Sequence, residues 1–187
     1  DGVMLSFGQN RVLQNIYLKC ESGSVTGLLG RNGCGKSSLM RIMFGEPLTE
    51  DRSVRIDNQS LLGSFRDPKD MRYLPQQHFI PKHLSLTRVL DDFGLKEKRL
   101  LENFPEFGEF PKLKVDQLSG GWQRILELYI ILMSESKFVL LDEPFSHIMP
   151  LHVETIKRLI VEEKQNKGIL ISDHLYQHIM EVSDQVY

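Results

Sequence analysis

The chain has 187 residues, enough for one domain with a buried core, and its 41% hydrophobic and 26% charged residues are typical of water-soluble globular proteins. The formal net charge of −2 argues against a basic surface for nucleic acid or anionic lipid, so we expect no nucleic-acid partner. The longest apolar stretch, residues 125–133, is far shorter than the roughly 20 residues of a membrane-spanning helix, so we expect no direct membrane insertion.

The first predicted elements are two strands and a helix. Residues 12–20 alternate imperfectly between apolar and polar side chains, which is typical of a half-buried strand. Residues 24–29 form a short apolar strand that ends at Gly30, and residues 36–44 form a helix that stops at Gly45. A strand, a glycine-rich loop and a helix therefore follow one another directly.

The loop between this strand and helix reads Gly30-x-x-x-x-Gly35-Lys36-Ser37, in the setting that phosphate binding requires. Glycines let backbone N–H groups turn toward nucleotide phosphates, and the helix start adds its positive dipole end. Lys36 would neutralise phosphate charge, and the Ser37 hydroxyl would bind Mg²⁺. The alternative is a glycine turn that happens to precede a lysine. The predicted nucleotide-binding residues here are Gly30, Arg31, Asn32, Gly33, Cys34, Gly35, Lys36, Ser37 and Ser38.

The middle of the chain combines short strands with a segment of different character. Residues 54–56 and 71–74 are predicted strands, separated by a polar, turn-rich stretch over residues 58–69. Residues 78–117 contain several prolines and glycines and short amphipathic pieces such as residues 95–103. We predict that this segment is a small helical lobe inserted into the main fold.

A second glycine-rich helix start lies at Ser119-Gly120-Gly121, directly before a predicted helix over residues 122–133. That helix is apolar nearly all round and is therefore predicted to be buried. A serine hydroxyl and two bare backbone amides at a helix start form an anion site. Alone the motif is weak, because such sequences are common in loops, but it stands shortly before an acidic strand end.

Two carboxylates follow a predicted strand over residues 137–141, whose continuous apolar character is typical of a parallel sheet interior. Asp142 and Glu143 would then lie at the carboxyl edge of the sheet, where open α/β sheets bind ligands. We expect Asp142 to hold Mg²⁺ through water and Glu143 to polarise the attacking water as a general base. Ordinary solvated acids are the alternative, and the phosphate loop upstream favours the catalytic interpretation.

The last third of the chain continues the alternation. Residues 153–160 place apolar side chains on one helical stripe, with Glu154 spaced to pair with Arg158 on the outer face. Residues 168–171 form another apolar strand, and a helix follows from about Leu175. Alternating strands and helices predict an α/β fold.

The two cysteines and the start of the sequence bear on the compartment. Cys20 and Cys34 have neither the number nor the spacing of a disulfide framework or a metal site. No charged-then-apolar signal opens the sequence. We therefore expect a cytoplasmic protein in a reducing environment.

The three glycine-rich and acidic segments together carry a resemblance that covers essentially the whole chain. The 30–37 loop, the 118–121 turn and the strand end at residues 138–144 resemble the Walker A, signature and Walker B segments of the ATP-binding domains of ABC transporters. The resemblance implies an α/β fold with a P-loop NTPase core, a small antiparallel β subdomain and a short inserted α-helical subdomain.

The resemblance also implies how such a domain is organised. The single domain 1–187 would comprise residues 1–77 and 136–187 as β subdomain and nucleotide-binding core, and residues 78–135 as helical signature subdomain. In the family, the signature serine and glycines bind the γ-phosphate of ATP held by the opposite subunit. The implied assembly is a homodimer or heterodimer that hydrolyses ATP with Mg²⁺ and drives an integral membrane permease from the inner face of the cell membrane.

Further residues match the family one by one. Gln76 resembles the Q-loop glutamine, which senses Mg²⁺ and the γ-phosphate and couples to the transport partner. His174 resembles the switch histidine that contacts the γ-phosphate, and Phe7 lies where the family stacks an aromatic ring on adenine, with a plain core position as the alternative. The implied catalytic residues are Lys36, Gln76, Glu143 and His174, the implied metal ligands are Ser37, Gln76 and Asp142, and the implied nucleotide contacts beyond the loop are Phe7, Ser119, Gly120 and Gly121.

The chain departs from the family pattern in two of these segments. The loop over residues 146–149 ends in Met149 instead of the aspartate that contacts the other subunit. Trp122 follows the signature glycines, where glutamine or glutamate is common. The sequence around Asp142 and Ser172 nonetheless looks most like the ATPases of lipopolysaccharide export and branched-chain amino-acid import.

Two other functions share these motifs. One is a soluble ABC protein of translation, DNA repair or iron–sulfur assembly, although the 187 residues hold no second cassette, coiled-coil insertion or basic stripe. The other is a site that binds ATP and hydrolyses it poorly because of Met149. We predict hydrolysis, because Glu143 is present. The transported substrate and its direction are not encoded here, because the cassette does not touch the cargo.

Overall fold

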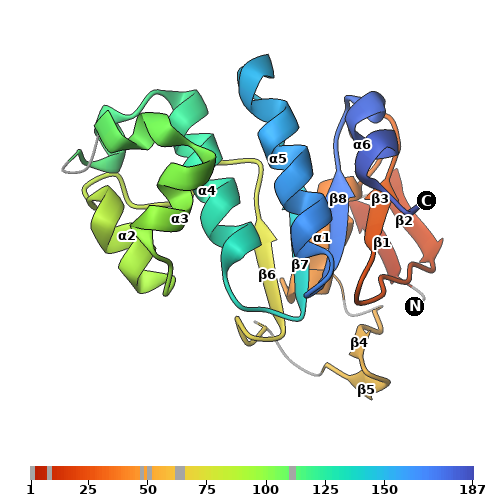
Figure 1. Cartoon of the computed structure of the whole chain (residues 1–187). Helices are drawn as coiled ribbons and strands as arrows, with labels where there is room; N and C mark the ends of the chain where they lie inside the picture. The colour runs from red at the N-terminus through yellow and green to blue at the C-terminus, as the bar shows by residue number, and fades with distance from the viewer. Residues whose placement is uncertain (1–2, 8–9, 47–48, 50–51, 62–65, 110–112) are drawn as a thin grey trace.

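A five-stranded parallel sheet lies at the centre of the computed structural model, which describes residues 3–7, 10–46, 49, 52–61, 66–109 and 113–187. The strand order is β6-β7-β8-β3-β9. Figure 1 labels β6, β7, β8 and β3 of this sheet. The strands are β3 (Val25–Leu28), β6 (Met71–Leu74), β7 (Phe138–Asp142), β8 (Gly168–Ser172) and β9 (Gln185–Val186). Because the strands are parallel, their carboxyl ends meet at one edge of the sheet.

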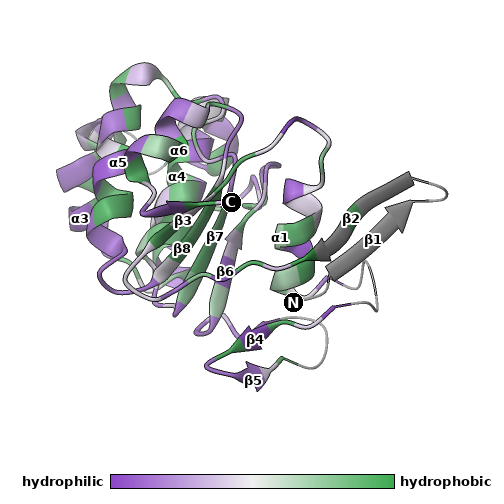
Figure 2. Cartoon of the chain, turned by 90° about the vertical axis from the view of Figure 1, so that its right-hand side faces the viewer, coloured by the Kyte–Doolittle hydropathy of each residue, from purple (hydrophilic) through white to green (hydrophobic). Residues whose placement is uncertain are grey.

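The apolar character of the middle strands explains why both faces of the sheet are covered. β7 and β8 are continuous apolar runs, and almost all of their residues are buried. One face carries α1 (Lys36–Phe44), and the other carries α4 (Gly120–Met133), α5 (Pro150–Glu163) and α6 (Tyr176–Val182), as Figure 2 shows. The predicted α/β fold class is confirmed.

Two small antiparallel sheets lie outside the central sheet. They pair β1 (Val3–Phe7) with β2 (Asn10–Ile16), and β4 (Arg55–Ile56) with β5 (Gln59–Ser60). The β4–β5 turn has Asp57 and Asn58 at φ of 51° and 63°, the left-handed conformation that two-residue hairpin turns need and that these residue types tolerate. The antiparallel strands agree with the resemblance, although β5 lies in a stretch for which the sequence predicted only turns.

The segment before α4 is largely helical. It contains α2 (Leu86–Asp92), α3 (Glu97–Asn103) and two 3₁₀ turns over residues 105–109 and 115–117, which lie beside α4 in Figure 1. Phe104 packs edge-on against Phe107 and against Tyr129 of α4, with ring centroids 6.4 Å apart in each pair. The division of the chain into subdomains stays a prediction. Within the described ranges, no helix is both long and apolar enough to cross a membrane.

Helix α4 begins two residues earlier than the apolar pattern predicted. Ser119 is its N-cap, and the Ser119 hydroxyl accepts a 3.4 Å hydrogen bond from the Trp122 N–H. The two signature glycines are therefore the first residues of the helix. Helix α1, in contrast, has the predicted bounds.

The predicted ion pair on α5 is wrong. Glu154 accepts a 2.7 Å hydrogen bond from Lys157, one turn along the helix, instead of pairing with Arg158. Arg158 pairs with Glu162 at 2.9 Å and also donates to Asn103 of α3. Spacing along the helix allowed several partners, and packing against neighbouring helices selected among them.

Candidate functional site

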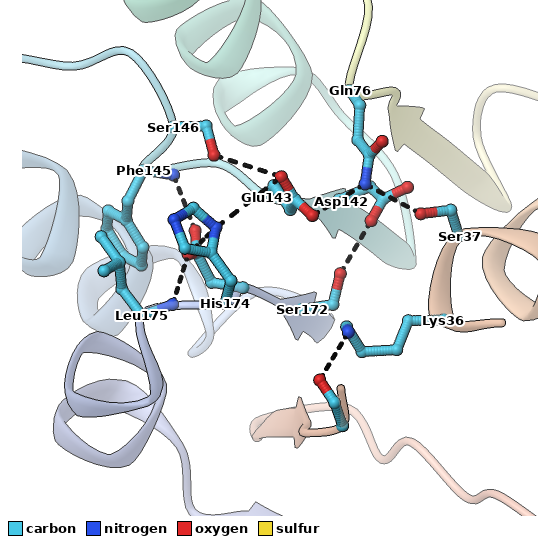
Figure 3. Close-up of polar contacts among 12 residues, drawn as sticks. Lys36, Ser37, Gln76, Asp142, Glu143, Phe145, Ser146, Ser172, His174 and Leu175 are labelled. Atoms are coloured by element: carbon cyan, nitrogen blue, oxygen red, sulfur yellow. Dashed lines mark hydrogen bonds and ion pairs between the residues drawn. The ribbon is translucent and has the colours of Figure 1, made fainter. Parts of the chain in front are cut away.

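Four predicted site segments converge at the carboxyl edge of the sheet. The glycine-rich loop follows β3, Gln76 follows β6, Asp142 and Glu143 lie at the end of β7, and His174 follows β8. Figure 3 shows the side chains of these segments facing one another across this edge. Open parallel sheets bind their ligands at this place.

The glycine-rich loop depends on its glycines for its shape. Gly33 and Gly35 have φ of 78° and 100°, in the left-handed region that residues with a Cβ avoid. A Cβ at Gly30 would lie 2.6 Å from the Cys34 sulfur. Helix α1 starts directly after Gly35, so its unpaired N–H groups and positive dipole end lie at the loop. The loop therefore has the backbone geometry of an anion site.

Lys36 folds back onto this loop. Its ammonium donates to the Gly30 carbonyl at 2.7 Å and to the Arg31 carbonyl at 3.1 Å, and the residue is 9% exposed. Arg31, Asn32 and Cys34 are exposed around it. One positive charge is thus held among the backbone groups that line the loop, where a phosphate oxygen can replace a carbonyl as its partner.

Gln76 joins the phosphate loop helix to the acidic strand end. Its side-chain nitrogen donates to the Ser37 hydroxyl at 3.0 Å and to Oε1 of Glu143 at 2.9 Å (Figure 3). Three predicted site residues, from α1 and from the segments that directly follow β6 and β7, are therefore in direct contact. The amide oxygen would be the metal ligand, so the side-chain amide, whose nitrogen contacts Ser37 here, would have to rotate.

Asp142 is buried and held by two hydroxyl groups. Its Oδ1 accepts a 2.8 Å hydrogen bond from Ser172, and its Oδ2 accepts one of 3.1 Å from Tyr73. Burial and the nearby Asp142 charge raise the pKa of the Tyr73 phenol well above its ordinary value, so the phenol keeps its proton and remains a donor. Sequence reasoning assigned no role to these two hydroxyl groups, although Ser172 is a polar residue that ends an apolar strand.

Glu143 has an unusual backbone conformation. Its φ is 49°, in the left-handed region, and its N–H donates to the Ser172 carbonyl at 2.8 Å. The second carboxylate oxygen, Oε2, accepts a 3.3 Å hydrogen bond from Ser146 and lies 3.8 Å from Nδ1 of His174. Gln76, Ser146 and His174 therefore surround the carboxylate that is predicted to be the base.

Asp173 anchors the loop that presents His174. Asp173 is buried, and its carboxylate accepts hydrogen bonds from the N–H groups of Phe145 at 3.2 Å and Leu175 at 2.9 Å. The His174 ring is 3.3 Å from the same carboxylate and remains partly exposed. The loops after β7 and β8 are thereby fixed to each other.

The Ser119 turn lies at the start of α4, beside the loop after β7. A Cβ at Gly121 would lie 3.0 Å from the His147 carbonyl, so the turn packs closely on the loop after β7. In the part of the chain that the structure describes, no hydrogen bond or ion pair joins Ser119, Gly120 or Gly121 to Lys36 or Ser37. The structure therefore does not bring the second anion motif into the cluster around Lys36.

The Phe7 side chain lies outside the described part of the structure, so its stacking on adenine stays a prediction.

Helix α4, predicted to be apolar nearly all round, contains two buried charged residues, Arg124 and Glu127. Arg124 donates to backbone carbonyls beside both Gln76 and Glu143. The signal in the sequence that could have revealed them is a pair of charged residues, Arg124 and Glu127, inside an otherwise apolar helix.

Sequence comparison assigns these features to a family. The sequence model described as ABC transporter matches residues 13–146. The chain is 33% identical over 192 residues to the lipopolysaccharide export system ATP-binding protein LptB of Escherichia coli K12, covering 95% of this chain and 80% of that protein. It is 26% identical over 200 residues to the high-affinity branched-chain amino acid transport ATP-binding protein BraG of Pseudomonas aeruginosa, covering 94% and 86% respectively.

The fold agrees with this assignment. A solved ATP-binding subunit of an ABC transporter superposes with a TM-score of 0.79 at 21% identity, over 98% of this chain and 82% of that one. The resemblance, the predicted ATPase and the transport interpretation are therefore confirmed over the non-transport alternative. The chain belongs to the ABC transporter family, as an ATP-binding subunit that hydrolyses ATP.

Proposed function

We propose that this subunit binds ATP with Mg²⁺ at the 30–38 loop, uses Glu143 as the general base, and works between two ATP-binding domains that drive a membrane permease. The bridge from Gln76 to Ser37 and Glu143 carries this proposal. It joins the start of α1, where phosphates would bind, to the carboxylate that would activate water. Binding and hydrolysis are thereby assigned to one cluster.

The side chains at the bridge fit Mg²⁺. Ser37, Gln76 and Asp142 offer hydroxyl, amide and carboxylate oxygens, the hard donors that Mg²⁺ prefers. Among the described residues, no group of three or more His, Cys, Asp or Glu side chains is placed to hold a metal by itself. Mg²⁺ commonly relies on one or two carboxylates together with substrate phosphates and water. When bound, the ion would neutralise phosphate charge.

The protein groups around the phosphates would have distinct tasks. Lys36 and the N–H groups at the start of α1 would bind the phosphate oxygens. Glu143 would accept a proton from the attacking water, with its two oxygens oriented by Gln76 and Ser146. His174, beside Oε2 of Glu143, would contact the γ-phosphate.

The Ser119 turn supports a site shared by two domains. Among the described residues, the turn has no hydrogen bond or ion pair to Lys36 or Ser37 of its own chain. We propose that its hydroxyl and amides bind the nucleotide that a second domain holds. That second domain would be another copy or a similar chain. The transport functions in the names of BraG and LptB support a membrane permease as the further partner, at the inner face of the membrane.

The test compares the parent chain with Glu143→Gln. We expect Mg²⁺-dependent ATP binding and hydrolysis by the parent. Glu143→Gln should keep ATP binding, lose about 100-fold or more of the turnover because an amide cannot accept the proton, and self-associate when ATP is added. Glu154→Gln, an exposed carboxylate on α5, is the matched control and should hydrolyse ATP like the parent.

Three results would contradict parts of the proposal. Turnover by Glu143→Gln at the parent rate would remove Glu143 from the role of base. Absence of both Mg²⁺-dependent ATP binding and ATP-promoted self-association would remove the shared site. Co-purification with ribosomes, and not with an integral membrane protein, would argue against the transport partner.

A further inference from the structure

Arg124 is a buried cation whose partners are almost all backbone carbonyls. It lies on the second turn of α4 and is 2% exposed. Its Nη1 donates to the Pro75 carbonyl at 2.6 Å, and its Nη2 donates to the Asp142 and Glu143 carbonyls at 2.8 and 3.0 Å. Within the described residues, its ion pair is with Glu127, whose carboxylate is 3.8 Å away. A buried guanidinium directed at three carbonyls needs an explanation beyond ion pairing.

Two of these carbonyls flank a left-handed residue. Glu143 has a φ of 49°, which places its Cβ in an unfavourable contact with the backbone. The carbonyls of residues 142 and 143 stand on either side of its Cα, and one guanidinium nitrogen binds both. Arg124 thus holds the turn in the conformation that directs the Glu143 carboxylate toward Gln76 and Ser146.

The third carbonyl leads to the other side of the cluster. Pro75 directly precedes Gln76, whose side chain contacts both Ser37 and Glu143. One guanidinium therefore holds the backbone beside both polar groups that would position the attacking water.

Glu127 fastens the same segment one turn further along α4. Its buried carboxylate accepts hydrogen bonds from the Phe79 N–H at 2.9 Å and from the His78 ring at 3.0 Å. Residues 75–79 are consequently attached to α4 at both ends. Since α4 begins at the Ser119 turn, a displacement of that turn would also displace this segment and the Glu143 backbone.

We propose that Arg124 is a positioning residue for hydrolysis, which holds the left-handed turn at Glu143 and links it, together with Gln76, to the Ser119 turn. The inference rests on the proposed function of Glu143 and Ser119. In this proposal, the Ser119 turn contacts the nucleotide that a second domain holds, and α4 then aligns the Glu143 carboxylate. Arg124 itself touches neither nucleotide nor water in this assignment.

The experiment uses Arg124→Lys and Arg124→Met in the full chain. Lysine keeps the charge but its single nitrogen cannot span carbonyls on two segments, and methionine fills the space without leaving a buried charge. The matched control is Arg66→Lys, because Arg66 is also buried and also donates to a backbone carbonyl, that of Met43, outside the cluster. ATPase kinetics, ATP-promoted self-association in the Glu143→Gln background, and melting temperature are measured for each.

We expect kcat to fall by about 10-fold or more in a folded Arg124 variant, because small misplacement of a catalytic group is costly. The KM for ATP and the ATP-promoted self-association should stay within about twofold of the parent, since the phosphate loop is intact. Arg66→Lys should retain the parent kcat.

Three results would overturn the inference. One is a kcat within about twofold of the parent in a folded Arg124 variant. The second is a loss of ATP binding equal to the loss of kcat. The third is the failure of both Arg124 variants to fold. Either of these two results would indicate a structural role for Arg124. If the parent chain itself does not hydrolyse ATP, the proposed function fails as well, whereas an active parent with an unaffected Arg124 variant rejects only this inference.

Discussion

Ser172 and Asp142 stand opposite each other on neighbouring parallel strands, and the Ser172 hydroxyl donates a 2.8 Å hydrogen bond to the Asp142 carboxylate. Both residues are almost completely inaccessible to solvent. The Ser172 and Tyr73 hydroxyls together supply protein hydrogen-bond donors to the buried Asp142 carboxylate. This pair therefore prepares the carboxylate that is proposed to face Mg²⁺.

Ser172→Ala should destabilise the protein without nucleotide. Removing one donor from a buried carboxylate should lower the free energy of unfolding by about 1–3 kcal/mol, as measured by urea denaturation without Mg²⁺. Ser24→Ala, which removes a hydroxyl bonded to the Glu21 carbonyl in an exposed turn, should change it by less than about 0.5 kcal/mol. An equal fall in the free energy of unfolding in both variants would show that the hydrogen bond to Asp142 contributes no more to stability than the exposed one.

Ser119→Asp should separate helix capping from anion binding. Aspartate caps a helix as well as serine does, but its charge would repel the phosphate of a nucleotide held by a second domain. We expect an unchanged melting temperature and loss of ATP-promoted self-association in the Glu143→Gln background. Ser85→Asp, at the N-cap of α2, is the matched control because its hydroxyl caps that helix in the same way.

Mixing two inactive variants extends this test. Lys36→Ala lacks the phosphate-binding lysine, and Ser119→Asp lacks the second anion site, so a mixed pair of copies would contain one intact composite site. ATP-promoted association should return when the two are mixed in the Glu143→Gln background. Association by Ser119→Asp alone would contradict the shared site.

The two cysteines should differ in reactivity and in their response to nucleotide. Cys34 is exposed in the phosphate loop, whereas burial raises the pKa of the Cys20 thiol to about 11. Because the thiolate is the reacting species, iodoacetamide at pH 8 should alkylate Cys34 and spare Cys20, and Mg²⁺ with ATP should slow the reaction at Cys34. Peptide mass spectrometry would follow both sites, and alkylation of Cys34 at the same rate with and without ATP would argue against nucleotide on this loop.

The Cys20 thiol should lower the free energy of unfolding at high pH. The folded pKa of Cys20 lies above its ordinary value of 9.0, so the folded state keeps a proton that the unfolded state loses. The stabilising contribution is complete below about pH 9 and is lost as the pH rises toward 11. Cys20→Ser should flatten the fall in unfolding free energy across this window, and an unchanged slope would contradict the assignment.

The parts of the site that could be predicted are those whose residues are neighbours in the sequence. The 30–38 loop lies between a recognisable strand and helix, and Asp142-Glu143 ends an apolar strand, so neighbouring residues were enough to indicate their place. The fold class and family follow from the same segments and are confirmed. The individual roles of Gln76, His174 and Ser119 stay predictions.

The parts that could not be predicted depend on which segments meet in space. The register of β8 on β7 sets Ser172 beside Asp142, and nothing local to either residue reveals it. Arg124 interrupts an apolar run, but its partners are carbonyls 18 to 49 residues away, and carbonyls carry no sequence signal. The same limit explains the wrong partner for Glu154, because several lysine and arginine side chains lie within reach of one helix face.

The close approach of Gly121 to the His147 carbonyl has a consequence for the altered loop that ends in Met149. At a Cβ distance of 3.0 Å, a larger residue at position 121 would require the His147 carbonyl to move by a few tenths of an ångström, and His147 itself has a φ of 65°. The two segments therefore approach each other through main-chain atoms, and we expect a displacement of one to move the other. If a second domain contacts the Ser119 turn, as proposed above, that contact would reach the loop that ends in Met149 through this main-chain approach, without needing an acidic side chain at position 149.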